Sequence, residues 1–180
     1  MIVLFDMFGV IAREQSPEVM ASMSTSPEFW GAYWAHRPAY DRGDVTAEEY
    51  WALVGHPPLV ELDVQSWSRV DDEMVALLGE LHAAGRRIAL LSNIPEDHAR
   101  NFERTYEWLD LFEVRGFSCR IGHAKPEPGA FEWCREQLGG GDILFVDDRL
   151  ENVRASERAG MRGHHFTGIE NLRACLQSTL

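Results

Sequence analysis

The sequence contains three short apolar runs, each followed directly by side chains that suit catalysis or metal binding. The runs with their following residues are Ile2–Phe5 with Asp6, Ile88–Leu91 with Ser92 and Asn93, and Ile143–Val146 with Asp147 and Asp148. They lack the alternation of a half-exposed strand and so predict strands buried on both faces, as in a parallel sheet. Ligands of open α/β sheets bind beyond the carboxyl ends of the strands. We therefore expect these polar side chains to converge there.

The second half of the chain alternates between strand and helix patterns. Predicted strands lie at 2–6, 87–91, 114–118, 142–146 and 162–166, with helices beginning near Pro95, Pro126, Arg149 and Ile169. Alternation of this kind implies right-handed crossovers with helices on both faces of the sheet. The expected fold is an α/β, doubly wound parallel sheet.

Residues 14–70 carry helix signals but no strand pattern. Ser16-Pro17 and Ser26-Pro27 are typical of a helix start, with an N-cap residue before a proline. Thr46 and Glu49 form a capping-box pattern, and Asp71 begins a further amphipathic helix. We therefore predict a helical segment inserted after the first strand. The predicted division is an α/β core of 1–13 and 71–180 with a helical cap of 14–70.

Composition narrows the possible partners. The chain has 180 residues, which favours one domain with a small insertion, and a formal net charge of −12. No Lys/Arg cluster occurs, so nucleic acid and anionic membranes are poor partners. No signal-peptide pattern or apolar stretch of ~20 residues is present, and the three cysteines have no metal spacing, so a cytoplasmic protein is expected. A monomer and a homodimer both remain open.

Four motifs occur in order, each at a predicted strand end or helix start. They are Phe5-Asp6-Met7-Phe8-Gly9-Val10, Leu91-Ser92-Asn93, Lys125-Pro126-Glu127-Pro128, and Phe145-Val146-Asp147-Asp148 with Asn152. Together they make the chain resemble the haloacid dehalogenase-like (HAD-like) hydrolases over nearly its whole length. The phosphatase-like branch with a small helical cap after the first strand is the most similar.

The resemblance implies a Mg²⁺-dependent phosphatase acting on a small phosphorylated substrate. A carboxylate can attack phosphorus and form an aspartyl-phosphate, which divides one difficult displacement into two steps. The resemblance makes Asp6 the nucleophile and assigns catalytic roles to Ser92 and Lys125. Its expected substrate-binding residues are Gly9, Ser92, Asn93 and Lys125. Its expected metal ligands are Asp6, the main-chain carbonyl of Phe8, Asp147 and Asp148, and Asn152 is expected to orient Lys125 or the Asp148 loop.

Phe8 is a departure from the family pattern. Most phosphatases of the family carry a second Asp there, which protonates the leaving oxygen. A phenyl ring moves no proton, and a positioned acid or base is typically worth ~10²–10⁴ in rate. Three functions therefore stay open: a phosphatase suited to good leaving groups, a non-catalytic binder of phosphate compounds, and a 2-haloacid dehalogenase, whose halide leaves without a proton. The dehalogenases do not use Mg²⁺, whereas this chain has the Asp147-Asp148 pair.

Histidines and cap aromatics are secondary candidates. His123 and His36 are possible substitutes for the missing acid, although a structural or surface role is favoured for both, and His164-His165 is interpreted as structural. The aromatics between Phe29 and Trp51 are spaced for a helix–helix core. A few of them are expected to line the roof of the pocket.

Overall fold

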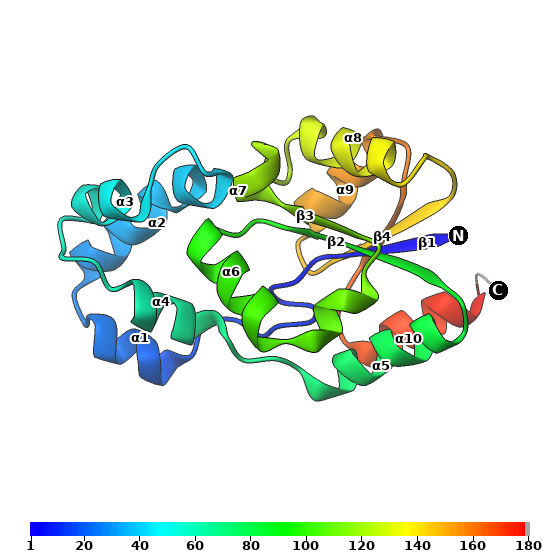
Figure 1. Ribbon diagram of the computed structural model, residues 1–180, viewed down its shortest axis with the longest axis horizontal. Coiled ribbons are helices and arrows are strands. Elements are labelled where there is room, and N and C mark those ends of the chain that lie inside the picture. The colour runs from blue at the N-terminus through cyan, green and yellow to red at the C-terminus, as the bar shows by residue number, and fades with distance from the viewer. Residues whose placement is uncertain (179–180) are drawn as a thin grey trace.

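The structure, a computed structural model, describes residues 1–178. Its centre is a five-stranded parallel sheet in the order β3-β2-β1-β4-β5 (Figure 1). The strands are β1 Ile2–Phe5, β2 Arg87–Ser92, β3 Val114–Phe117, β4 Ile143–Asp147 and β5 Arg162–His165. All five predicted strands are present, and the doubly wound α/β prediction is confirmed.

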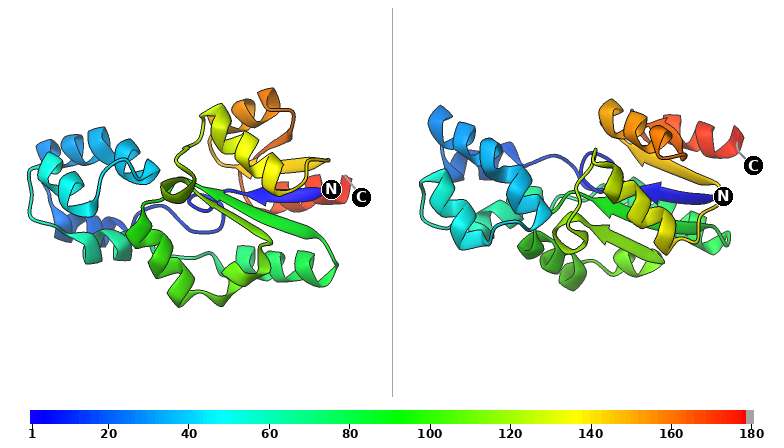
Figure 2. Two further views of the ribbon diagram at one scale, coloured as in Figure 1. Left: turned by 45° about the horizontal axis from the view of Figure 1, so that its top comes forward. Right: turned by 90° about the horizontal axis from the view of Figure 1, so that it is seen from above.

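Helices cover both faces of the sheet, as Figure 2 shows. Val3 and Phe5 of β1 face one apolar cluster, while Ile2 and Leu4 face another. The first cluster is covered by α5 Asp72–Ala83, α6 Glu96–Thr105 and α10 Ile169–Ser178; the second is covered by α8 Pro128–Gln137 and α9 Leu150–Arg158. Because both faces are buried, the central strands need apolar side chains at every position, which explains the runs without alternation.

The helix starts follow local capping chemistry, with one error in the prediction. Ser16, Ser26, Thr46 and Asp71 each cap a helix through a side-chain oxygen, as predicted. The helix expected at Pro126 begins instead at Pro128. A residue that precedes a proline avoids the α region, so Glu127 lies outside the helix and Pro128 takes its first position. Two short helices, η1 Glu107–Leu111 and α7 Ser118–Ile121, were not predicted.

A second group of helices lies beyond the carboxyl ends of the strands (Figure 1). It comprises α1 Pro17–Met23, α2 Pro27–Arg42, α3 Ala47–Val54 and α4 Val60–Trp67. These helices enclose an apolar cluster of their own, which includes Phe29, Tyr33, Tyr40, Tyr50 and Trp51. Most of the aromatics noted in the sequence therefore pack between helices.

The two connections between the sheet and these four helices lie side by side. Ala12 and Val70 form an antiparallel bridge. The amide of Arg13 donates to the carbonyl of Arg69 at 2.7 Å, and the amide of Asp71 donates to the carbonyl of Ile11 at 2.9 Å. None of the helices in residues 1–178 is both long and apolar enough to cross a bilayer.

Candidate active site at the carboxyl edge of the sheet

Three carboxylates and one ammonium group meet where β1 and β4 end. Asp6, Asp147 and Asp148 each offer an oxygen, and these oxygens lie within 4.8 Å of one another. Lys125 Nζ lies 2.6 Å from Asp6 Oδ1 and 2.8 Å from Asp147 Oδ2. The sheet register explains the meeting, since the residues preceding Asp6 and Asp147 are neighbours on adjacent strands.

Burial and charge act against each other in this cluster. Burial raises the pKa of Asp6 well above its usual value, the Lys125 ammonium opposes that shift, and Asp147 adds to it. Burial lowers the pKa of Lys125, but the Asp6 and Asp147 carboxylates outweigh this and leave it raised. Burial and the Asp147 charge also raise the pKa of Asp148. One cation thus faces three carboxylates, and a further cation is needed for all three to ionise easily.

The donor set fits Mg²⁺. This ion prefers oxygen ligands, binds through one or two carboxylates, and keeps several waters. Asp6 and Asp147 are buried and Asp148 is half-buried, so the cluster combines protein oxygens with access for water.

Asn93 and Asn152 hold the charged groups in place. The Asn93 amide donates to the Lys125 carbonyl at 2.8 Å and accepts from the Lys125 amide at 2.8 Å. This pair of bonds fixes the backbone that carries the Lys125 side chain. Asn152 Nδ2 donates to both oxygens of Asp147 at 3.1 Å. Asn152 was expected to orient Lys125 or the Asp148 loop; its direct contact is with the Asp147 carboxylate, whose Oδ2 also accepts from Lys125.

Ser92 lies at the end of β2 with its hydroxyl unsatisfied. Its side chain is completely buried, and Oγ has no hydrogen-bond partner. Asn152 Oδ1 is also buried without a partner. A buried polar atom without a partner costs roughly 1–3 kcal/mol. Both atoms lie on residues next to the charged cluster, where a bound ligand or water would satisfy them.

Gly9 allows Asp148 to approach the loop after β1. Its φ of 84° lies in the left-handed region, and a Cβ at this position would lie 2.3 Å from Asp148 Oδ2. A side chain here would collide with one of the three clustered carboxylates. The requirement for glycine is therefore local and steric.

Phe8 takes part in aromatic packing at the position expected for a second Asp. Its ring centroid lies 4.9 Å from that of Trp67 and 5.7 Å from that of Phe102. The side chain thus joins α4 to α6 and offers no proton to the site.

A cavity of about 250 Å³ opens onto the cluster. The sheet edge contributes Asp6, Phe8, Gly9, Glu14, Asn93, Lys125, Asp148, Arg149 and Asn152, and the helical segment contributes Trp34, Arg37, Asp41 and Trp67. Within the described residues this lining includes neither His36 nor His123. His123 is exposed, and its Nδ1 lies 3.7 Å from Glu127 Oε2 instead. Of the cap aromatics, Trp34 and Trp67 reach the cavity.

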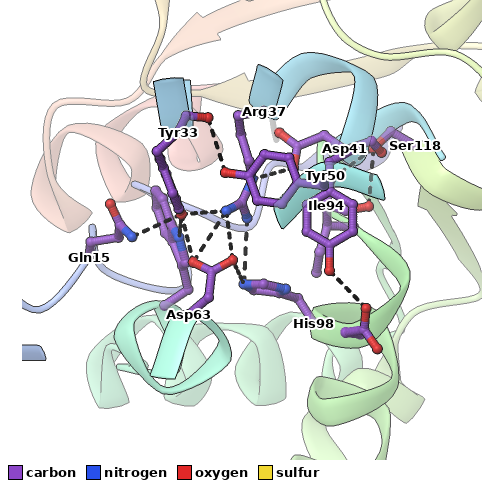
Figure 3. Close-up of polar contacts among 12 residues, drawn as sticks. Gln15, Tyr33, Arg37, Asp41, Tyr50, Asp63, Ile94, His98 and Ser118 are labelled. Carbon is purple, nitrogen blue, oxygen red and sulfur yellow. Dashed lines mark hydrogen bonds and ion pairs between the residues drawn. The ribbon is translucent and has the colours of Figure 1, made fainter. Parts of the chain in front are cut away.

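A buried polar network that reaches the cavity at Arg37 and Asp41 was missed from the sequence (Figure 3). The Arg37 guanidinium lies at its centre: Nε donates to Asp41 at 2.7 Å, Nη1 donates to Asp63 at 3.0 Å, and Nη2 lies 3.5 Å from His98 Nε2. The Tyr33 hydroxyl donates to Asp63 at 2.6 Å. Since His98 belongs to α6, the network ties the helical segment to the core. Arg37, Asp63 and His98 have the local sequence context of ordinary surface residues, so nothing in the sequence marked them.

Two curated proteins are similar to this chain in sequence. A sesquiterpene phosphatase of Aspergillus oryzae is 37% identical over 112 residues, covering 61% of this chain and 56% of the relative. A phosphoglycolate phosphatase of Cereibacter sphaeroides is 32% identical over 108 residues, covering 59% and 49%. The chain thus spans about half the length of the curated relatives it matches.

Solved structures extend the likeness of fold. A HAD family enzyme from Bacteroides thetaiotaomicron, in complex with magnesium and inorganic phosphate, superposes with a TM-score of 0.77 at 17% identity, covering 91% of this chain and 92% of that one. An L-2-haloacid dehalogenase from Xanthobacter autotrophicus gives 0.68 at 20% identity, covering 98% and 82%. The model of the haloacid dehalogenase-like hydrolase family matches residues 1–160. The chain therefore belongs to the haloacid dehalogenase-like hydrolases.

Proposed function

We propose that the protein is a Mg²⁺-dependent phosphatase that hydrolyses small phosphate monoesters through an aspartyl-phosphate on Asp6. The observation that carries the proposal is a buried Asp6 carboxylate that lines the cavity and lies among Asp147, Asp148 and Lys125. Two relatives named as phosphatases, and a structural neighbour with magnesium and phosphate bound, support the same chemistry.

The proposed first step is attack by an Asp6 oxygen on phosphorus. The new bond forms as the bond to the leaving oxygen breaks, and the leaving group takes the electron pair. Lys125 Nζ and the unpaired Ser92 hydroxyl are the donors that stabilise the transferred phosphoryl group. Water then cleaves the acyl phosphate and restores Asp6. Mg²⁺ held by Asp6, Asp147, Asp148 and the Phe8 carbonyl supplies positive charge against the phosphate.

The supporting groups have positioning roles. Asn93 fixes the Lys125 backbone and offers its own amide near the phosphate, whereas the Gly9 amide, also expected there, donates to the Ala12 carbonyl at 2.7 Å. The four helices between residues 14 and 70 act as a cap that covers the leaving-group side. The division into a core of 1–13 and 71–180 and a cap of 14–70 is part of this proposal.

Phe8 defines which substrates react fastest. With no acid to share the charge that develops on the leaving oxygen, the rate depends on the leaving group itself. Acyl and aryl phosphates are therefore the best substrates, and simple alkyl phosphates are poor ones.

The test is phosphate release from acetyl phosphate, phenyl phosphate and glucose 6-phosphate. Each reaction is run with about 5 mM Mg²⁺ and again with excess EDTA, which removes the metal. We expect Mg²⁺-dependent release that falls steeply from the first substrate to the last. No release from any of them would refute the proposal. Metal-independent chloride release from 2-chloropropionate would identify a dehalogenase instead.

A non-catalytic phosphate-binding protein is the second candidate, and Phe8 is the observation that favours it. Phe8→Asp separates the two, because a restored acid raises the turnover of glucose 6-phosphate if the rest of the site is competent. A binder gains nothing from that substitution.

A further inference from the structure

We infer that the organic part of the substrate is apolar and lies along the side chains of Phe8, Trp67 and Trp34, which we call the aromatic wall. This inference rests on the proposed function and adds the substrate class. The leaving group it specifies carries an aryl ring or alkyl chain and no second acidic group.

The aromatic wall runs without a break from the reacting centre to solvent. Phe8 follows Asp6 by two residues and lines the same cavity. Its ring centroid lies 4.9 Å from that of Trp67, which lies 6.2 Å from that of Trp34. Trp34 is 47% exposed although it is a large apolar side chain. An exposed tryptophan that continues a buried aromatic surface marks a place where an apolar ligand gains contact area.

Each cation in the described lining of the cavity has a partner inside the protein, although the Arg149–Glu151 pair is exposed. Within the described lining, Lys125 is paired with Asp6 and Asp147, and Arg149 is paired with Glu151. The third cation is Arg37, and each of its three nitrogens has a partner inside the protein.

The remaining charges in the lining are repulsive to an acid. Glu14 and Asp41 present carboxylates to the same cavity. Asp41 is already paired with Arg37 at 2.7 Å, so a second carboxylate or phosphate on the substrate would meet the Glu14 charge without a free counterion. Repulsion between these like charges disfavours binding of a substrate whose leaving group carries a second acidic group.

The size of the cavity sets the length of the apolar group. Ligand pockets typically measure ~300–1,000 Å³, so about 250 Å³ holds a phosphate and a short chain or single ring. A longer chain passes Trp34 and leaves the cavity along the exposed face of its indole.

Non-hydrolysable alkylphosphonates measure this contact without requiring turnover. Dissociation constants are determined by calorimetry with Mg²⁺ present for the series from ethyl- to hexylphosphonic acid. Burial of each methylene is expected to tighten binding about two- to fourfold until the chain leaves the cavity. 3-Phosphonopropionic acid, which places a carboxylate near the end of a butyl-length chain, is expected to bind at least about tenfold more weakly than butylphosphonic acid.

Two variants locate the contact. Trp34→Ala removes the outer part of the aromatic wall and is expected to flatten the dependence on chain length, with about a tenfold loss for hexylphosphonic acid. Leu53→Ala is the matched control, because Leu53 is a cap residue with a similar exposure of 49% that does not line the cavity. It should leave the series unchanged.

The outcomes separate this inference from the proposed function. Equal affinity across the alkyl series, or tighter binding of 3-phosphonopropionic acid, overturns the inference whatever the enzyme hydrolyses. Absence of phosphate release from acetyl phosphate overturns the proposed function, while a chain-length dependence that Trp34→Ala removes still supports the aromatic wall.

Discussion

The protein buries two clusters of charge that differ in what they leave open. At the sheet edge, three carboxylates share one ammonium group, and the nearby Ser92 hydroxyl has no partner. On the helical side of the cavity, Arg37 meets two carboxylates, and its three nitrogens all have partners inside the protein. The first cluster has three carboxylates to one cation and opens onto a cavity, whereas in the second every guanidinium nitrogen of Arg37 is paired, although His98 Nδ1 is buried without a partner.

This difference indicates that the cluster at the sheet edge serves ligand binding and that the Arg37 cluster serves helix packing. A cluster that is incomplete without a ligand carries a cost in the unliganded protein, which binding relieves. A cluster that is complete holds helices in register and gains nothing from a ligand. Substitutions in the two clusters should therefore affect different measurements.

The largest expected effect is that of Asp6→Asn on turnover. The substitution preserves shape but removes the nucleophile, so phosphate release from acetyl phosphate should fall by at least about 10⁴-fold. The midpoint of thermal unfolding should change little, because Lys125 keeps its ion pair with Asp147. Ordinary activity in a pure sample of this variant would contradict the role assigned to Asp6.

The next effect belongs to the Arg37 cluster. Asp63→Asn leaves a buried guanidinium with one carboxylate fewer, which should lower the free energy of unfolding by about 3 kcal/mol. Turnover by the folded protein should change little, because Asp63 does not line the cavity. Denaturant unfolding measures the expected loss of stability, and steady-state rates measure the expected constancy of turnover.

Asp44→Asn is the matched control for that substitution. Asp44 also pairs with an arginine of the cap, Arg42 at 2.5 Å, but this pair lies at the surface. Its loss should cost no more than about 1 kcal/mol. Equal costs for the two variants would show that burial does not distinguish the pairs.

Ser92→Ala should produce opposite changes in stability and activity. The substitution removes a buried hydroxyl without a partner, so the free energy of unfolding should stay the same or rise. Loss of a hydrogen bond to a charged phosphate, ~1.5–3 kcal/mol, should lower kcat/KM about 10- to 150-fold. A loss of stability would indicate that Ser92 has a structural partner after all.

The smallest expected effect is a change in stability at acidic pH. Burial raises the pKa of Asp63, but the Arg37 guanidinium, with hydrogen bonds from His98 and Tyr33, lowers it to about 2. The lowered pKa stabilises the fold at pH values above about 4, the pKa of an aspartate in the unfolded chain. This stabilisation is lost as the pH falls toward 2. The stability difference between wild type and Asp63→Asn should therefore shrink by on the order of 2 kcal/mol between pH 5 and pH 2. A constant difference would show that Asp63 is not the titrating group.

The sequence predicted the core of the fold because the information there is local. The unbroken apolar run Ile2–Phe5 requires cover on both faces, and Ser16 and Thr46 carry their capping signal within three residues. Asp6, Ser92 and Asp147 lie together simply because parallel strands end at one edge. The start of α8 was misplaced because two prolines compete within three positions, and the second one decides.

The network around Arg37 was not predictable in the same way. Arg37, Asp63 and His98 come from three helices, and each has the local context of an ordinary surface residue. Their burial depends on how α2 and α4 pack against α6, which no spacing along the chain specifies. The same holds for Phe8: its identity raised the question of chemistry, while its contact with Trp67 became visible only in three dimensions.

The bridge between Ala12 and Val70 holds the two ends of the intervening segment side by side. Residues 14–69 begin and end at neighbouring points, so the sheet and its crossovers contain no connection that depends on the length of that segment. Closing a loop of a different length costs only slightly more entropy as the loop grows. Asp6 and Asp147 therefore keep the positions that β1 and β4 give them whatever the length of that segment, while the buried contacts of His98 with Arg37 and Asp63 hold the segment on the core.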